Sequence, residues 1–247
     1  MDKYTKKFKI PYYDGDKYGY IRSVNILKYF GETSSEETDI LLEGSEDIKD
    51  FGWMLYRWKV EILRYPRTQE KVEVDTWVSK VDRFYAYREF TMTDEEGGLL
   101  ASASTVWIGV DMKRKRPIRI PKTYSDKMAI IGQANFDDFS DFREELKIED
   151  YSDFKVRRSD IDSNEHVNNT KYLSWLIESV PEDIYREYDL LEFEIIYKKE
   201  IKYGDIISTG FEIESEDDDS ISFKHVIKSC DKSEEHSFGK TRWIKKD

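Results

Sequence analysis

The sequence contains one pattern twice, with a period of about 135 residues. LRYPRTQEKVEV and YKKEIKYGDIIS occupy corresponding places, and TVWIGVD and TRWIKKD close the two halves alike. Solenoid repeats are shorter, at roughly 20–50 residues, so the period indicates duplication of a whole fold. We therefore expect two copies of one small fold within a single chain, a built-in pseudo-dimer.

Each half combines one helical segment with several strand-like segments. The first half has a predicted helix over 23–42, with Ser23 as its N-cap, and the second has one over 168–179 that ends before Pro181. The predicted strands are 53–63, 71–81, 84–94 and 99–111, and then 151–157, 190–201, 205–215, 220–229 and 235–246. The fold class is therefore α+β, with one helix on an antiparallel sheet in each half. The halves are predicted as residues 1–111 and 151–247, joined by a crossover linker over 112–150.

The composition excludes several classes of protein. A net charge of −12 argues against nucleic acid as the main partner, because phosphate binding needs a basic face. No apolar run approaches the roughly 20 residues of a membrane span, and MDKYTKKFKI lacks the apolar core of a signal peptide. Cys230 is the only cysteine, so neither a disulfide framework nor a cysteine-based metal site is expected. We expect a cytoplasmic protein without metal or cofactor.

The segment SDIDSNEHVNNTKYLSWL, from Ser159 to Leu176, contains the residues best suited to chemistry. Asp162, Asn164 and His166 alternate, so in an extended segment their side chains would point to one side. The predicted helix then begins near Val167–Thr170, where unpaired N–H groups and the helix dipole stabilise an anion. A carboxylate, an amide and an imidazole beside such a helix start suit the attack of water on an acyl carbonyl.

The same residues also have a structural interpretation. Asp and Asn before a helix are preferred turn and capping residues, and a single histidine is often structural. The segment lacks a general base. The candidate is Glu200, just before the turn KYGD, because this position of the repeat lies opposite the helix. Glu200 could equally be a solvated glutamate at a strand end. His225 and His236 occur in strand-like segments without a nearby acidic pattern, so we interpret them as structural.

The residues from Asp162 to Trp175 resemble a family signature. They match Asp-x-Asn-x-His-Val-Asn-Asn-x-x-Tyr-x-x-Trp, the pattern of the second half of acyl-ACP thioesterases, which act on acyl carrier protein (ACP). WMLYRWKVEILRYPRTQEKVEVDTWV is similar to the first-half strands of that family, and FEIIYKKEIKYGD to the segment that carries its catalytic glutamate. The resemblance covers nearly the whole chain and fits the shorter bacterial type.

The resemblance implies a double hot-dog fold and hydrolysis of fatty acyl-ACP to free fatty acid and holo-ACP. It assigns the catalytic set to Asp162, Asn164, His166 and Glu200 in the second half, with the first half shaping the acyl pocket. Many plant members have a cysteine directly after the glutamate, whereas this chain has Ile201, and Cys230 lies in another strand. A mechanism in which water attacks is therefore favoured over a thiol nucleophile.

Further site residues follow from this reading. The backbone N–H groups of Val167, Asn168 and Asn169 are expected to polarise the thioester carbonyl. The candidate acyl-pocket residues, each also a plausible core residue, are Ile26, Phe30, Leu41, Trp53, Leu55 and Trp107. The basic residues expected near the mouth of the site, where they would dock acidic ACP, are Arg157, Arg158, Lys198, Lys199 and Lys202. The expected partners are acylated ACP and the fatty acyl chain, with the protein a monomer or a homodimer.

Three alternatives stay open. An acyl-CoA thioesterase is one, although the 4-hydroxybenzoyl-CoA type usually consists of single hot-dog chains that assemble. A hot-dog dehydratase or hydratase places its histidine and acid differently and lacks the His-Val-Asn-Asn run. A non-catalytic protein that binds acyl chains or ACP would bind ligand without releasing product.

Overall fold

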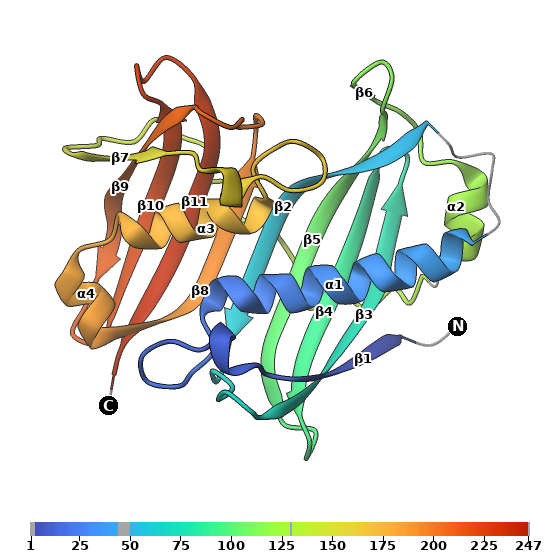
Figure 1. The fold of residues 1–247 in the computed structure, drawn as a ribbon, viewed down its shortest axis with the longest axis horizontal. Coiled ribbons are helices and arrows are strands. Elements are labelled where there is room, and N and C mark those ends of the chain that lie inside the picture. The colour runs from blue at the N-terminus through green and yellow to red at the C-terminus, as the bar shows by residue number, and fades with distance from the viewer. Residues whose placement is uncertain (1–2, 44–49, 129, 247) are drawn as a thin grey trace. The chain divides into compact units, whose positions relative to one another are not determined.

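The computed structural model describes residues 3–43, 50–128 and 130–246. The chain divides into two compact units, Met1–Asp138 (unit 1) and Phe139–Asp247 (unit 2). Figure 1 shows that each unit has a sheet with one main helix across it, α1 in unit 1 and α3 in unit 2. The boundary between the units falls inside the segment predicted as a linker.

Unit 1 is built on an antiparallel sheet. Its elements are β1 (Tyr4–Lys9), α1 (Ser23–Leu42), β2 (Phe51–Ile62), β3 (Lys71–Asp82), β4 (Tyr85–Asp94), β5 (Leu99–Asp111), β6 (Arg116–Pro117) and α2 (Lys122–Lys127). The strand order is β1-β3-β4-β5-β2, with β6 paired to β5. The helix α1 spans the residues predicted from the sequence, but the prediction of Ser23 as its N-cap is wrong, because Arg22 holds that position and no side chain caps the helix.

The helix α1 is held on the sheet by an aromatic stack and by a buried ion pair. Phe30 stacks on Phe90 of β4, with ring centroids 5.1 Å apart. Two turns further along α1, Glu37 pairs with the buried guanidinium of Arg88, which also donates to Thr76 Oγ1 at 3.1 Å. Removing one partner of such a pair would leave an uncompensated buried charge, so the pair fixes where α1 lies on the sheet.

The segment predicted as a linker contains secondary structure of its own. The helix α2 places Tyr124 in the core of unit 1, where its ring lies 5.2 Å from that of Trp53 and 5.3 Å from that of Phe51. With 6 residues, α2 is too short to show a helical period in the sequence, which is why it was missed.

Unit 2 repeats this plan with a shorter helix. Its elements are β7 (Tyr151–Lys155), α3 (Asn169–Glu178), α4 (Glu182–Glu187), β8 (Tyr188–Tyr197), β9 (Ile206–Glu216), β10 (Ser220–Ser229) and β11 (Glu235–Lys245). The order β7-β9-β10-β11-β8 matches that of unit 1, strand for strand. The sequence predicted β8 to reach 201, but it ends at Tyr197. Glu200 therefore lies in the turn beyond the strand.

The helix α3 lies close against its sheet. A Cβ added at Gly239 of β11 would collide with the side chain of Leu176 on α3, so glycine permits this close approach. Within the described residues of both units, no helix is long and apolar enough to cross a membrane.

Candidate active site

The segment with Asp162, Asn164 and His166 is a closed loop, so the expected extended conformation is wrong. Ile161 and Val167 form an isolated antiparallel bridge, and the N–H of Asp162 donates to the carbonyl oxygen of His166 at 2.9 Å. Glu165 at the tip has a positive φ of 65°. We refer to residues 161–167 as the site loop. Because the segment is not extended, the alternating positions do not place the three side chains on one side of it. The backbone conformation of the loop sets the direction of each side chain.

The loop brings His166 to Glu200. Nε2 of His166 lies 2.9 Å from Oε2 of Glu200, within hydrogen-bonding distance. The His166 side chain is 25% exposed and that of Glu200 is 52% exposed, so solvent reaches both side chains. An imidazole and a carboxylate in contact at a solvent-accessible place can take a proton from water and pass it on.

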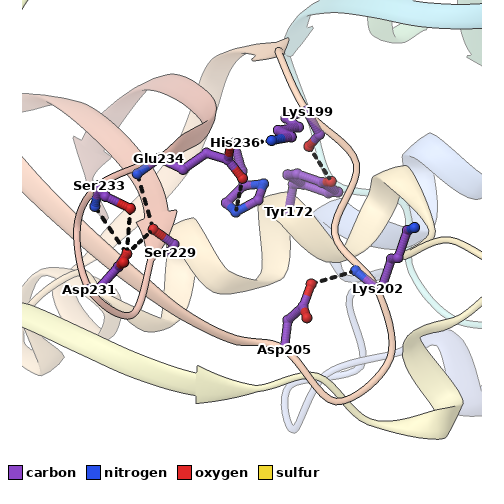
Figure 2. Close-up of polar contacts among 9 residues, drawn as sticks. All are labelled: Tyr172, Lys199, Lys202, Asp205, Ser229, Asp231, Ser233, Glu234 and His236. Carbon is purple, nitrogen blue, oxygen red and sulfur yellow. Dashed lines mark hydrogen bonds and ion pairs between the residues drawn. The ribbon is translucent and has the colours of Figure 1, made fainter.

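Backbone hydrogen bonds hold the Glu200 segment against the site loop. The N–H of Val167 donates to the carbonyl oxygen of Ile201 at 3.0 Å, and the N–H of Lys199 donates to that of His236 at 3.1 Å. Figure 2 shows Tyr172 of α3 directed at the backbone of Lys199, where its hydroxyl donates to the carbonyl oxygen at 3.4 Å. Glu200 is thus fixed through the residues on both sides of it.

Asp162 and Asn164 do not contact the histidine–glutamate pair through their side chains. Oδ1 of Asp162 accepts the N–H of Asn164 at 2.9 Å, which stabilises the turn of the site loop. The Asn164 side chain is exposed, and across the described part of the chain it makes no hydrogen bond. Asp162 therefore has the geometry of a loop-fixing residue, as the structural interpretation allowed.

Of the three N–H groups expected to form an oxyanion site, two are already engaged. Val167 donates to Ile201, and Asn168 donates to the carbonyl oxygen of Asp160 at 2.8 Å. The side chain of Asn168 is the N-cap of α3, since its Oδ1 accepts the N–H of Thr170. Asn169 is the first residue of α3, so its N–H has no acceptor within the helix. Among the three, only the Asn169 N–H is left without an acceptor in the described residues.

The candidate acyl-pocket residues all lie in unit 1. Ile26 and Phe30 are buried on the sheet-facing side of α1. Trp53 and Trp107 are partly buried and pack against the apolar cluster around Tyr124. Leu55, on β2, is buried and lies opposite Trp107 in the sheet, whereas Leu41 is a partly buried residue near the end of α1.

The candidate docking residues differ in how far their charges are neutralised. Lys198 pairs with Glu235 at 2.6 Å, and Lys199 pairs with Glu234. Arg157, Arg158 and Lys202 are exposed, and the Arg158 guanidinium lies 4.9 Å from the ring centroid of Tyr203. The positive charge of this set that no carboxylate of the described residues neutralises therefore comes from these last three residues.

Unit 1 contains the same loop with different side chains. The N–H of Asp16 donates to the carbonyl oxygen of Tyr20 at 2.7 Å, and the N–H of Ile21 donates to that of Pro66 at 2.9 Å. These bonds correspond to Asp162–His166 and Val167–Ile201 in unit 2. Tyr20 therefore stands in the place of His166, and Tyr65, just before Pro66, in the place of Glu200.

The remaining histidines are buried in unit 2. Nε2 of His225 lies 2.8 Å from Oγ1 of Thr241, and burial lowers the pKa of the His225 imidazole to about 3. It faces the core at the place where unit 1 has Phe90. His236 is also buried. Within the described residues, no group of three or more His, Cys, Asp or Glu could hold a metal ion.

Comparison with known proteins decides the family. Residues 1–128 match the acyl-ACP thioesterase N-terminal domain, and residues 143–245 match the acyl-ACP thioesterase C-terminal domain. The chain belongs to the acyl-ACP thioesterase family. Among solved structures, an acyl-ACP thioesterase from Bacteroides thetaiotaomicron is similar with a TM-score of 0.85 and 22% identity, over 97% of this chain and 96% of that one.

Plant members of the family are also similar. The 12:0-ACP thioesterase from Umbellularia californica has a TM-score of 0.85 and 19% identity, over 99% of this chain and 94% of that one. An acyl-[acyl-carrier-protein] hydrolase from Cuphea viscosissima is 26% identical over 81% of this chain and 50% of its own length. The chain thus spans about half the length of this curated relative. The fold of these acyl-ACP thioesterases confirms the predicted α+β double hot-dog fold.

Two tyrosines that the sequence did not single out contact the backbone of the candidate site. Tyr172 on α3 and Tyr197 at the end of β8 have ring centroids 5.0 Å apart. The hydroxyl of Tyr197 donates to the carbonyl oxygen of Asn169 at 3.0 Å. Tyr172 is part of the quoted signature, so the signal was present, but its partners become visible only once the chain is folded.

Proposed function

We propose that this protein hydrolyses the thioester of fatty acyl-ACP and releases free fatty acid and holo-ACP. The contact between His166 and Glu200, at the start of α3, carries this proposal. Membership of the acyl-ACP thioesterase family supports it, because relatives are named as hydrolases of acyl-ACP. The thioester is the bond to be cleaved, and the paired side chains supply the base that water needs.

In the proposed mechanism, the oxygen of a water molecule attacks the thioester carbonyl carbon. Glu200, or His166 sharing the proton with it, accepts the proton of that water as the new C–O bond forms. The N–H of Asn169 stabilises the negative oxygen that develops on the carbonyl. The C–S bond then breaks, and the sulfur of the carrier arm takes the proton and leaves as a thiol.

Asp162 supports this chemistry from within the site loop. Its hydrogen bond to the N–H of Asn164 fixes the turn that precedes His166. We retain Asn164 in the proposal because its exposed side chain could reach a bound substrate or the attacking water. Cys230 is exposed in the turn after β10, so a thiol nucleophile has no support next to Glu200.

In this proposal, residues other than His166 and Glu200 bind the acyl chain and the carrier. Ile26, Phe30, Leu41, Trp53, Leu55 and Trp107 remain the candidate acyl-pocket residues. Arg157, Arg158 and Lys202 are the stronger docking candidates, because Lys198 and Lys199 are paired with glutamates. A cytoplasmic location and a monomeric or homodimeric state stay predictions.

Thiol release from acyl-ACPs of short, medium and long chains, beside matched acyl-CoAs, tests the proposed function. Release from acyl-ACP, with little from acyl-CoA, and its loss in Glu200→Ala and His166→Ala are the expected results. Equal release from acyl-CoA would indicate an acyl-CoA thioesterase. Binding of acyl-ACP without release of any thiol would overturn the proposal in favour of a binding protein.

A further inference from the structure

The hydroxyl of Tyr172 lies against the two peptide groups that flank Glu200. It donates to the carbonyl oxygen of Lys199 at 3.4 Å (Figure 2). Burial raises the pKa of this hydroxyl, and a hydrogen bond from the backbone of Ile201 acts in the opposite direction. The Tyr172 side chain is 3% exposed, so these contacts are shielded from water.

Tyr197 connects the same region to the first turn of α3. Its hydroxyl donates to the carbonyl oxygen of Asn169, whose N–H is the proposed oxyanion donor. Its ring meets that of Tyr172 edge-on, with an interplanar angle of 79°. The two tyrosines therefore link the start of α3, the end of β8 and the turn that carries Glu200.

Unit 1 shows what the fold requires at these two positions when no histidine–glutamate pair is present. The matching hydrogen bonds of the two units place Ile26 where unit 2 has Tyr172. They place Ile62, the last residue of β2, where unit 2 has Tyr197. Both isoleucines are buried, at 0% and 1% exposure. An apolar side chain is thus sufficient to build this corner of the fold.

The backbone differs at the same place. Ile201 of unit 2 carries an N–H, whereas Pro66 at the corresponding position of unit 1 has none. Pro66 therefore has no N–H for which a side chain at position 26 would have to supply an acceptor. Ile201 is buried and has an N–H, and the Tyr172 hydroxyl can accept a hydrogen bond from it. The hydroxyl, the extra donor and the histidine–glutamate pair occur together in unit 2 and are all absent from the described residues of this corner of unit 1.

We propose that Tyr172 and Tyr197 are positioning residues, whose hydroxyls hold the Glu200 turn and the start of α3 at the spacing that brings Glu200 to His166. Neither tyrosine touches the reacting atoms in this account. The proposal rests on the proposed thioesterase function for its kinetic consequence, but its geometric consequence is independent of catalysis. Loss of either hydroxyl would let Glu200 or Asn169 move relative to His166.

Tyr172→Phe and Tyr197→Phe test the proposal, because each keeps the buried ring and removes only the hydroxyl. Tyr29→Phe is the matched control. Tyr29 is a buried tyrosine of α1 whose hydroxyl donates to Oδ2 of Asp14 at 2.6 Å, beside the corresponding loop of unit 1. All three variants lose one tyrosine hydroxyl, but only Tyr172→Phe and Tyr197→Phe lose it at the proposed site.

The kinetic readout separates positioning from stability. At a temperature where thermal melting shows every variant folded, kcat for acyl-ACP should fall about ten- to hundredfold in Tyr172→Phe and Tyr197→Phe. KM should change by less than about twofold, since substrate contacts are unaltered. Tyr29→Phe should lower the melting temperature alone. A lowered melting temperature with unchanged kcat in both site variants would show a purely structural role and overturn the proposal.

A second readout does not depend on activity. The chain has 3 histidines, so the ring resonances of His166 can be assigned by comparison with a His166→Asn variant. They should shift in Tyr172→Phe in the direction seen in Glu200→Gln, and stay in place in Tyr29→Phe. If the wild-type protein releases no thiol, the proposed function fails while these resonances still decide the geometry. Unmoved His166 resonances in Tyr172→Phe would overturn the positioning proposal.

Discussion

Nε2 of His166 lies 2.9 Å from Oε2 of Glu200, although one residue belongs to a loop before a helix and the other to a turn after a strand. Val167 follows His166 and Ile201 follows Glu200, and the N–H of Val167 donates to the carbonyl oxygen of Ile201. This bond brings the two side chains into contact. A backbone hydrogen bond therefore sets the distance between two side chains that meet in the solvent-accessible part of unit 2.

Glu200→Gln should reduce turnover of acyl-ACP at least about a hundredfold, within the range of general-base catalysis. The amide keeps the size of the side chain but cannot accept a proton from water. Thiol release under saturating substrate measures the effect, with Glu165→Gln as control, because Glu165 is an exposed carboxylate of the same loop. Near-wild-type turnover in Glu200→Gln would remove it from the role of base.

Asp162→Asn and Asp16→Asn should have the same effect on folding and different effects on turnover. Each carboxylate accepts backbone N–H groups of its loop, Asn164 in one case and Tyr18 and Tyr20 in the other. Loss of the charge should lower the free energy of unfolding by about 1–2 kcal/mol in both variants. Urea denaturation measures this, and only Asp162→Asn should also lower kcat, at least about tenfold. An equal loss of kcat in Asp16→Asn would contradict the assignment of the site to unit 2.

His225 should make the protein less stable in mild acid. Burial lowers the pKa of its imidazole to about 3 in the folded protein, whereas an unfolded histidine titrates near about 6.5. Below that value the unfolded chain binds a proton that the folded chain does not, so stability is present at neutral pH and is lost as pH falls. The loss should reach about 2 kcal/mol between about pH 7.5 and about pH 5.

The variant His225→Phe isolates this effect, because Phe90 occupies the corresponding place in unit 1. Urea denaturation at both pH values should show a smaller loss of stability in the variant than in the wild type. The same pH dependence in both proteins would show that the buried imidazole is not its source.

Arg157→Glu and Arg158→Glu should weaken the use of acyl-ACP more than the use of acyl-CoA. Both residues are exposed, and reversal of charge repels an acidic carrier. KM for acyl-ACP should rise about three- to tenfold and the effect should shrink at high salt, because exposed charges are screened. Lys28→Glu, an exposed lysine on α1, gives the same charge change as a control. Equal effects of the arginine variants on both substrates would argue against a docking surface.

The sequence predicted most of the fold because its patterns are long. The helix over Ser23–Leu42 and the strand over Leu99–Asp111 were predicted with the bounds that the structure has. The repeat between TVWIGVD and TRWIKKD predicted the matching sheets of the two units. The helices α2 and α4 were missed because 6 residues are too few for a helical period to appear.

The site was only partly predictable, for a different physical reason. Parity suggested that Asp162, Asn164 and His166 share one side, but the bond between Asp162 and the carbonyl oxygen of His166 closes the segment into a loop. The turn-forming Ser-Asn-Glu sequence at its tip was the signal against an extended segment. The contact of His166 with Glu200, and the links made by Tyr172, depend on pairing between distant segments, which no local pattern contains.

Pro66 of unit 1 also limits how this protein could evolve or be redesigned. Four substitutions would copy the histidine, the glutamate and both tyrosines of unit 2 onto positions 20, 65, 26 and 62 of unit 1. They would still lack the peptide hydrogen that Ile201 supplies and Pro66 does not. To reproduce the arrangement of unit 2 in full, Pro66 would therefore also have to be replaced by a residue that carries a peptide N–H.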